Sequence, residues 1–226
     1  MGEIILYEGK GAAPDLKTTL AFMQCTEDNP MYAELCDIYW EQEAKIKSII
    51  RPKGVFTEGK LRVQGENEDL AVGRDVIYSM VTLGSEIVDY IREKSEEDML
   101  EGMMVDFMAD SALFSFGEEL SEEIRKYSMD KGFGIRRGYE PPNLLPMEAQ
   151  RDAWEILKAE KKLGITMTDG FMLRPIKSNG TIYTISDNPK EFNVKHDCGN
   201  CDMKECPNRH TTRYAGGAGS SVNVSC

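Results

Sequence analysis

The sequence contains little histidine and no long apolar run. Only 2 of its 226 residues are histidines, and the hydrophobic residues, 41% of the chain, are scattered in short groups. A membrane-spanning helix needs roughly 18 or more consecutive apolar residues. The N-terminal segment "MGEIILYEGKG" also lacks the basic stretch and apolar core of an export signal. We therefore expect a cytoplasmic protein that does not contact a membrane.

Positive charge is scarce as well. The chain carries 27 Lys and Arg against 39 Asp and Glu, which gives a formal net charge of −12. Because binding to a nucleic acid duplex requires a cationic face, we do not expect nucleic acid as a partner. An acidic surface suits a protein partner that presents a basic face.

Cysteines are few but unevenly placed. Without an export signal, the six cysteines favour reduced thiols or metal ligands over a disulfide scaffold. The segment "HDCGNCDMKECPNRH", residues 196–210, holds three of them in the spacing C-x2-C-x4-C, followed directly by proline. Three thiolates this close can bind one metal centre, although the spacing is not that of ferredoxins. Residues that could supply a fourth ligand are Cys226, His196, His210, Cys25 and Cys36.

Three interpretations of this segment remain open from the residues alone. They are an iron–sulfur cluster, a structural zinc ion held by thiolates with or without imidazole, and thiols or a disulfide without metal. Cys25 and Cys36 lie eleven apart in a region with helical patterning, where plain buried thiols are the simplest interpretation.

The first half of the chain mixes helix and strand signals. Asp15 or Pro14 begins a helix, and "IIRPKGVFTEGKLRVQG" predicts two strands joined by a turn at Glu58-Gly59. "RDVIYSMVTLG" predicts a buried strand that stops at Gly84. Residues 85–128 then keep one apolar stripe through at least two helices.

Two details of those helices suggest specific roles. Ser95 and Asp98 have the pattern of a capping box that opens the second helix. The methionines of this helix recur at helical spacing, and core filling explains them better than cofactor contact. They are Met99, Met103, Met104 and Met108.

The second half begins with an irregular stretch. Glycines and prolines in "DKGFGIRRGYEPPNLLP" oppose regular structure. "MEAQRDAWEILKAEKKLG" predicts an amphipathic helix that ends at Gly164, and residues 165–186 predict two strands joined by a hairpin at Ser178-Asn179-Gly180. We expect an α+β fold, a mostly antiparallel twisted sheet with long helices packed on it, over residues 1–190. A Cys/His-rich appendage would follow over residues 191–226.

Several short motifs then occur in a fixed order. They are Gly138-Tyr139, Pro146–Gln150, Gly164-Ile165 and Met172–Ser178. In this order they resemble the activation domain of cobalamin-dependent methionine synthase, particularly its stand-alone relatives. With "VTLGSEIVDYI" and "FSFGEELSEEI" upstream, the resemblance covers roughly residues 50–187.

The resemblance implies the reactivation of a corrinoid cofactor. A corrinoid cobalt cycles between Co(I) and methyl-Co(III), and an occasional electron loss leaves it as inert Co(II). The family's domain covers the corrinoid of its partner while one electron is delivered and S-adenosylmethionine donates a methyl group. The chain would then be an accessory component of cobalamin-dependent methyl transfer in methionine biosynthesis. Its partners would be a corrinoid-binding protein or methyltransferase and an electron donor protein.

The resemblance also implies a ligand site beside Gly138-Tyr139. In the family an arginine just before this motif grips the carboxylate of S-adenosylmethionine, which suits the forked guanidinium group. Here Arg136 and Arg137 directly precede Gly138, so either Arg136 takes that role or the pair is solvated on a turn. Gly138 allows a close ligand approach or a positive-φ turn. Tyr139 stacks on an adenine or corrin edge, or caps the core.

Two further positions follow from the same resemblance. Lys177 and Ser178 match the stand-alone pattern and could face an anionic ligand or a corrinoid side chain, although a lysine beside a hairpin is usually solvated. The family's methionine synthases carry a tyrosine after the last strand. The matching position here is near Glu191 or Phe192, where no tyrosine occurs.

Stand-alone members often end in a C-x2-C-x4-C segment, which implies a role for the cysteine cluster. Reactivation needs an electron, which an iron–sulfur cluster, most simply a 4Fe-4S cluster, can supply and zinc cannot. We expect its ligands to be Cys198, Cys201, Cys206 and Cys226. The chief alternative is a non-redox module that binds or assembles a corrinoid protein and contains structural zinc. A self-contained methyltransferase lacks support, because no GxGxxG loop follows a strand.

Overall fold

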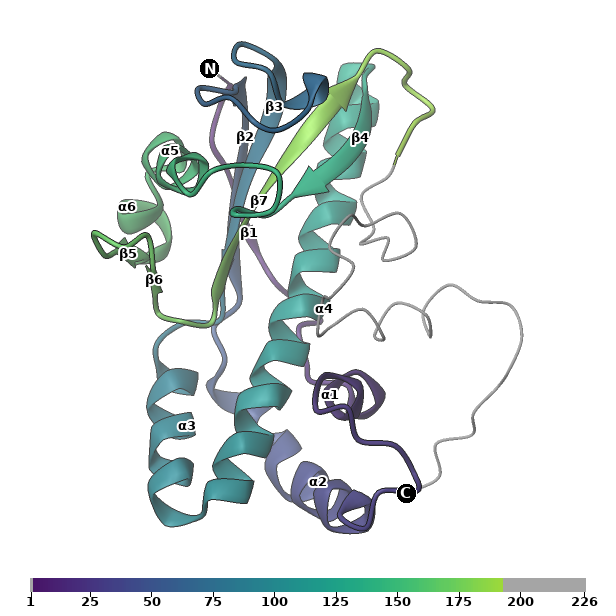
Figure 1. The fold of residues 1–226 in the computed structure, drawn as a ribbon, viewed down its shortest axis with the longest axis vertical. Helices are drawn as coiled ribbons and strands as arrows, with labels where there is room; N and C mark the ends of the chain where they lie inside the picture. Colours follow the sequence, from purple (N-terminus) through teal and green to yellow (C-terminus); the bar gives the residue numbers. More distant parts are fainter. Residues whose placement is uncertain (1, 193–226) are drawn as a thin grey trace.

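The structure, a computed structural model, describes residues 2–192. Outside the described residues lie the predicted ligands of the C-terminal segment, His196, Cys198, Cys201, Cys206, His210 and Cys226. The centre of the described part is a five-stranded antiparallel sheet in the order β1-β2-β3-β7-β4 (Figure 1). Its strands are β1 (Ile5–Glu8), β2 (Lys53–Lys60), β3 (Asp75–Thr82), β7 (Ser178–Ser186) and β4 (Gly134–Tyr139). A separate two-stranded sheet consists of β5 (Thr166–Met167) and β6 (Leu173–Arg174).

Helices cover both faces of the sheet and form a second layer beneath it. The helices are α1 (Leu16–Phe22), α2 (Tyr32–Ile49), α3 (Glu86–Glu97), α4 (Met99–Lys131), α5 (Glu148–Leu157) and α6 (Ala159–Leu163), with one 3-10 turn, η1 (Glu68–Leu70). Figure 1 shows α4 along one side of the sheet and α5 and α6 on the other, with α2 and α3 below. No helix within residues 2–192 is both long and apolar enough to cross a bilayer.

The sheet separates two hydrophobic cores. Side chains alternate between its faces, because successive residues of a strand point in opposite directions. On β3, Val76 and Tyr78 belong to the core under α5 and α6, whereas Ile77 and Val81 belong to the core under α4. Both faces of β3 are therefore buried, as its run of apolar residues predicts.

Helix α4 joins the sheet to the helical layer. Its 33 residues extend about 50 Å at the usual rise per residue. The N-terminal half packs with α1, α2 and α3 through residues such as Met104 and Met108, and the C-terminal half packs under the sheet through Phe116 and Ile124. One continuous helix thus contributes to two cores, which fixes the helical layer against the sheet. The two outer methionines, Met99 and Met103, are exposed, so core filling explains only part of the methionine pattern.

Several sequence predictions are confirmed. The fold is α+β with an antiparallel sheet and long helices. Asp15 caps α1 by accepting a hydrogen bond from the Thr18 amide at 2.8 Å. Gly84 follows β3 in the left-handed region at φ 88°, and Gly164 ends α6 at φ 71°. Two helices occupy most of residues 85–131.

Three local predictions are wrong. β2 continues through Glu58-Gly59 to Lys60, so no turn occurs there. Ser178-Asn179-Gly180 is not a hairpin but the first part of β7, paired with β3 along its length. Ser95 does not cap α4: its hydroxyl donates to the Ile91 carbonyl at 2.7 Å within α3, and Asp98 alone caps α4.

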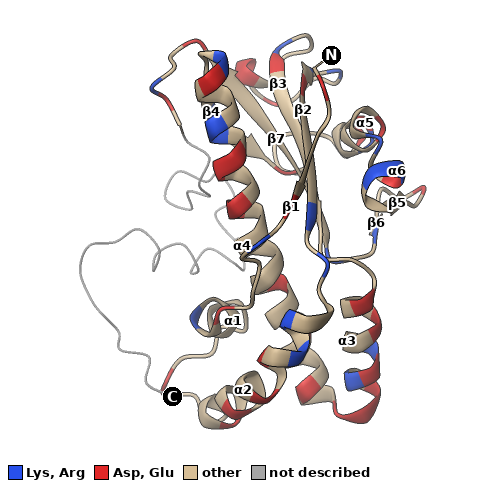
Figure 2. Cartoon of the chain, turned by 180° about the vertical axis from the view of Figure 1, so that it is seen from behind, with Lys and Arg blue, Asp and Glu red and all other residues tan. Residues whose placement is uncertain are grey.

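Two further expectations need correction. The stretch predicted to be irregular contains β4, and the single helix predicted to end at Gly164 is divided into α5 and α6. The division occurs at Lys158, which adopts φ 52° and ends α5. Acidic residues are spread along α3 and α4, as Figure 2 shows, and four of them pair with basic residues three positions away.

Candidate functional site

The predicted site residues lie in two places on neighbouring strands. Arg136 to Tyr139 belong to β4, whereas Lys177 and Ser178 stand at the beginning of β7. The antiparallel register pairs Tyr139 with Ile182, four residues beyond Ser178. Four residues of strand span roughly 13 Å. Even Tyr139, the residue of the first group nearest to Ser178 in the register, is separated from it by this length of β7, so the two groups do not form one cluster.

Arg136 occupies an irregular position on the edge strand. The pairing of β4 with β7 shifts between Ile135 and Arg137, so Arg136 is an extra residue in a β-bulge. Its Nη1 lies 2.5 Å from Oδ1 of Asp69, and its Nε lies 3.9 Å from Oε1 of Glu191. Arg136 is thus paired with two carboxylates rather than simply solvated.

Both carboxylates are positioned by their backbones. Asp69 lies in η1 beside the fully buried Leu70, and the amide of Gly65 donates to the Leu70 carbonyl at 2.8 Å. The same loop is attached to the segment after β4, because the Glu66 amide donates to the Leu144 carbonyl at 3.0 Å. The β2–β3 loop therefore carries Asp69 to the edge of β4.

Glu191 reaches Arg136 from the end of β7. Its Oε2 accepts a hydrogen bond from the Ser186 hydroxyl at 2.5 Å, and its carbonyl accepts one from the Ile135 amide at 2.8 Å. Phe192 packs against the core under α4. The region where the family's tyrosine would follow the last strand thus contains a carboxylate beside Arg136 and an aromatic ring turned toward the core.

Arg137 and Tyr139 lie together on the other face of β4 from Gly138. The guanidinium carbon of Arg137 lies 5.2 Å from the centre of the Tyr139 ring, a cation–π geometry. Tyr139 is buried in the core under α5 and α6. This burial agrees with the interpretation of Tyr139 as a core residue.

Gly138 is explained by packing rather than by a turn. It lies within β4, and it is absent from the glycines with positive φ. A Cβ atom at Gly138 would lie 2.9 Å from a ring carbon of Tyr183 and 3.0 Å from the Thr181 methyl group. The positive-φ interpretation is therefore wrong, and the glycine makes room for the cross-strand tyrosine.

Lys177 is buried in an ion-pair cluster with α4. Its side chain is only 6% exposed, and its Nζ lies 2.6 Å from Oδ1 of Asp110 and 2.8 Å from Oδ1 of Asp106. Burial raises the pKa of Asp110, with Lys177 acting in the opposite direction and Asp106 adding to the rise. The interpretation of Lys177 as a solvated residue is wrong. Ser178 donates to the Thr82 hydroxyl at 2.8 Å, across the β3–β7 pair.

Sequence reasoning missed Glu140, which links the two groups. Its Oε1 accepts hydrogen bonds from Asn179 Nδ2 at 2.9 Å and from the Thr181 hydroxyl at 3.4 Å. The available signal was its position directly after the Gly-Tyr motif. The carboxylates around Arg136 and Lys177 gave no local signal, because each comes from a distant part of the sequence.

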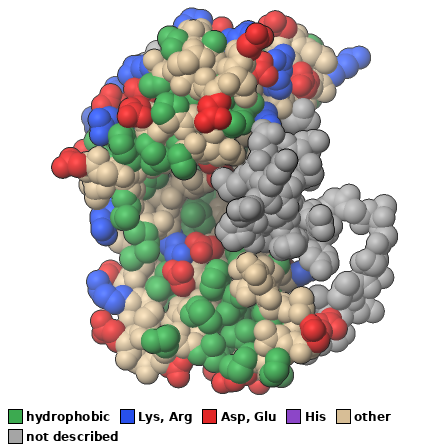
Figure 3. All heavy atoms as spheres, in the orientation of Figure 1, with side chains coloured by type: hydrophobic (Ala, Val, Ile, Leu, Met, Phe, Trp, Pro, Cys, Tyr) green, Lys and Arg blue, Asp and Glu red, His purple; other side chains and the backbone are tan. Residues whose placement is uncertain are grey.

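The molecule is hollowed where the sheet meets the helical layer. Figure 3 shows this recess, with basic and acidic side chains meeting at its centre and apolar side chains above and below. The Lys177 ion pairs join the start of β7 to α4. Several exposed apolar side chains of α4 and of the segment around β6 are close in sequence to Lys177 and its partners. They are Met99, Met103, Met172 and Ile176.

The described residues do not supply a metal centre of their own. Among residues 2–192, no three Asp, Glu, His or Cys side chains come together in a way that could hold a metal ion. Cys25 and Cys36 are both buried in the core of the helical layer, and burial raises the pKa of the free Cys25 thiol. The proposed ligands Cys198, Cys201, Cys206 and Cys226 lie outside the described residues.

Comparisons with known proteins place this geometry in context. A family model described as "Vitamin B12 dependent methionine synthase, activation domain" matches residues 71–209. Among solved structures, the MetH reactivation domain bound to AdoHcy aligns with a TM-score of 0.60 at 16% sequence identity. That alignment covers 86% of this chain and 82% of the other, so the two share a fold. No curated protein matches the chain.

Proposed function

This chain belongs to the family of the vitamin B12-dependent methionine synthase activation domain, and from that premise we propose that it reactivates a corrinoid carried by a partner protein. The observation that carries the proposal is the family match over residues 71–209, which includes β3, α3, α4, β4 and β7. The common fold with the MetH reactivation domain supports it.

The proposed reaction has two steps, with the partner's cobalt as substrate. A low-potential electron donor protein gives one electron to Co(II), which becomes Co(I). Co(I) then attacks the methyl carbon of S-adenosylmethionine, the carbon–sulfur bond breaks, and methyl-Co(III) and S-adenosylhomocysteine form. The reduction of Co(II) is thermodynamically unfavourable, and the methyl transfer drives it by consuming the Co(I) that forms. The protein contributes orientation and exclusion of water.

We place the S-adenosylmethionine site beside β4. Arg136 projects from the edge strand with its side chain 43% exposed, so a ligand can reach the guanidinium group. A ligand carboxylate could make two parallel charge-assisted hydrogen bonds with it. The relative that was crystallised with AdoHcy supports a ligand of this chemical type. Of the other predicted residues, Arg137 would line the site next to Arg136, Tyr139 would support Arg137 from the core, and Gly138 faces the other side of β4.

We place the corrinoid-bearing partner on the recess shown in Figure 3. Exposed methionines such as Met103 and Met172 suit an adaptable protein interface. Lys177 would shape this surface rather than bind an anion, because Asp106 and Asp110 already neutralise its charge. Ser178 would act in the same indirect way through Thr82.

The cysteine segment would hold a metal centre, with Cys198, Cys201, Cys206 and Cys226 as ligands. Thiolate ligands suit both an iron–sulfur cluster and zinc. An iron–sulfur cluster would fit electron delivery, whereas zinc would fit the alternative function, a non-redox module that binds or assembles the corrinoid protein. Anaerobic iron, sulfide and zinc analysis of the purified full chain distinguishes the two.

The decisive experiment measures reactivation directly. A cobalamin-loaded methionine synthase from which its own activation domain has been removed is poised as Co(II) under anaerobic conditions. The full chain, a chemical reductant and S-adenosylmethionine are then added, and the cobalamin spectrum and S-adenosylhomocysteine are followed together. We expect methyl-Co(III) and S-adenosylhomocysteine to appear in equal amounts and only when the chain is present. An unchanged spectrum and no effect on oxidation-state cycling would overturn the proposal.

A further inference from the structure

Arg136 meets both of its carboxylates through different edges of the guanidinium group. Asp69 contacts Nη1, on the end of the fork, and Glu191 approaches Nε, on its side. These are the two edges through which an arginine binds a carboxylate bidentately. The carboxylate of a ligand would therefore encounter Asp69 at one edge of the guanidinium group and Glu191 at the other.

We infer that Asp69 is a built-in competitor for the ligand's carboxylate at the end of the Arg136 fork, so that this edge accepts S-adenosylmethionine only when the Asp69–Arg136 ion pair opens. The inference rests on the proposed function, because it takes Arg136 as the carboxylate-binding residue. It makes Asp69 a residue that sets ligand affinity without contacting the reacting atoms.

Asp69 is well placed to compete. Leu70 is fully buried and the η1 loop is hydrogen-bonded to the segment after β4, so the Asp69 backbone is fixed. A carboxylate on a fixed backbone loses little freedom when it pairs, and it is present at a high effective concentration. A ligand in solution must overcome this advantage.

The Asp69–Arg136 pair is nevertheless exchangeable. The two side chains are 34% and 43% exposed, and exposed ion pairs contribute little to stability. A ligand that makes two parallel hydrogen bonds can replace such a partner. The Lys177 cluster differs, because its lysine is only 6% exposed and is held by two aspartates of α4. Of these two basic residues, Arg136 is the one whose partner a ligand can displace.

Calorimetry on the full chain tests the inference with three ligands. S-adenosylmethionine and S-adenosylhomocysteine carry the carboxylate, and 5′-methylthioadenosine lacks it. We expect Asp69→Asn to lower the dissociation constants of the first two by about two- to fivefold, the range expected for removing an exposed ion pair. The dissociation constant of 5′-methylthioadenosine should not change. Binding that appears only in Asp69→Asn would give the same support.

Two further variants make the test specific. Glu66→Gln removes one negative charge from an exposed position in the same loop, so it controls for net charge and should leave affinity unchanged. Arg136→Gln should weaken binding of both carboxylate ligands and abolish the effect of Asp69→Asn in the double variant. Thermal unfolding of each variant checks that the loop remains folded.

The outcomes separate this inference from the function on which it depends. If the wild-type chain binds S-adenosylmethionine and Asp69→Asn binds no more tightly, or Glu66→Gln has the same effect, the competitor role is wrong and the proposed function stands. If Asp69→Asn tightens 5′-methylthioadenosine equally, the effect does not pass through the carboxylate and the inference is also wrong. If no variant binds any ligand, both the inference and the methyl-donor step fall.

Discussion

At the scale of single residues, hydrogen bonds decide how Glu119 titrates. This carboxylate of α4 accepts a hydrogen bond from the Tyr7 hydroxyl at 2.6 Å and from the amides of Lys10 and Gly11 at 3.0 and 3.2 Å. Burial by itself raises the pKa of Glu119, but these hydrogen bonds outweigh it and hold the pKa below its ordinary value. The hydrogen bond with Glu119, together with burial, raises the pKa of Tyr7 to about 12. Glu119 therefore fastens the N-terminal segment to α4 in its ionised form.

Lowering the pH should weaken the attachment of the N-terminal segment to α4. Because the pKa of Glu119 is lower in the folded protein, its contribution is complete above the unfolded value of about 4.3 and is lost as the pH falls through the folded value. Glu119→Gln should lower the free energy of unfolding by about 1 kcal/mol at neutral pH, discounted for the partly exposed carboxylate. Urea unfolding from pH 7 to pH 3 should show this difference shrinking toward zero. Glu118→Gln, an exposed neighbour, is the control, and a difference that does not change with pH would contradict the role of the charge.

At the scale of secondary-structure elements, the strand glycines show what the sequence could and could not predict. Gly59, Gly138 and Gly180 all suggested turns or irregular backbone, yet all lie within strands. A Cβ atom on each would come within 3.3 Å of a side chain on the neighbouring strand, a tyrosine ring in two cases and a methionine in the third. The turn propensity of these glycines is overridden because each one leaves space for a large side chain on the neighbouring strand. The sequence of one segment does not show which residues will lie across from it in the sheet. Helix patterns depend on local spacing, which is why the helices of residues 85–131 were predicted well.

Replacing two glycines by alanine should have opposite effects on stability. Gly138→Ala forces Cβ into the Tyr183 ring and should lower the free energy of unfolding by about 1–3 kcal/mol. Gly117→Ala, in the middle of α4 with nothing within 4 Å of the new Cβ, should raise it by about 0.5–1 kcal/mol. Urea unfolding of both variants measures this, and a stabilised Gly138→Ala would show that Gly138 is not held by packing.

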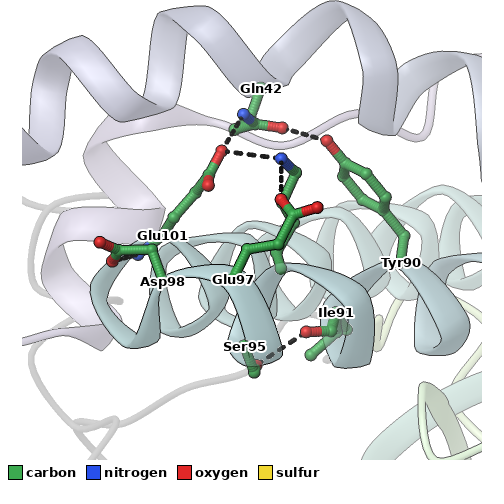
Figure 4. A network of polar contacts seen from close by, with 8 residues as sticks. Gln42, Tyr90, Ile91, Ser95, Glu97, Asp98 and Glu101 are labelled. Atoms are coloured by element: carbon green, nitrogen blue, oxygen red, sulfur yellow. Dashed lines mark hydrogen bonds and ion pairs between the residues drawn. The ribbon is translucent and has the colours of Figure 1, made fainter.

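A polar network connects α2 to the α3–α4 pair (Figure 4). The Tyr90 hydroxyl donates to Gln42, whose Nε2 donates to Oε1 of Glu101 at 2.5 Å. Lys94 Nζ lies 3.3 Å from the same oxygen and 2.9 Å from Glu97. The network satisfies a buried glutamine between helices that otherwise meet through apolar contacts.

Gln42→Leu should destabilise the helical layer although it adds an apolar side chain. Tyr90 and Glu101 would each lose a partner in a mostly buried place, at a cost of about 1–3 kcal/mol. In a double-mutant cycle, Tyr90→Phe should cost less in the Gln42→Leu background than in the wild type. Additive effects of the two substitutions in chemical denaturation would mean that the network is not coupled.

At the scale of the whole molecule, the order of elements was more predictable than the contacts at the site. The resemblance located Arg136 to Tyr139 beside one another, as the structure has them on β4. It did not reveal that Arg136 pairs with a residue 67 positions away, or that Lys177 is neutralised by α4 across an equal separation. Such pairings depend on how the β2–β3 loop and the long helix fold back on the sheet. A charged residue whose position in the sequence suggests a ligand contact can thus form an ion pair within the protein.

The two ends of α4 offer a matched test of the docking surface proposed for the corrinoid protein. Met103 lies one turn before Asp106, which pairs with Lys177 at the start of β7, whereas Met129 lies in the last turn of α4. Their side chains are exposed to similar extents, 43% and 52%.

A glutamate at an interface leaves a charge without water or partner, which typically costs several kcal/mol. Met103→Glu should therefore weaken binding of cobalamin-loaded methionine synthase lacking its activation domain by tenfold or more, measured by sedimentation or calorimetry. Met129→Glu should leave this binding unchanged. Met103→Glu should not alter the affinity for S-adenosylmethionine, because Met103 lies near the N-terminal end of α4, whereas β4 follows the C-terminal end of that helix. Equal effects of the two variants would place the partner elsewhere or reduce the result to net charge.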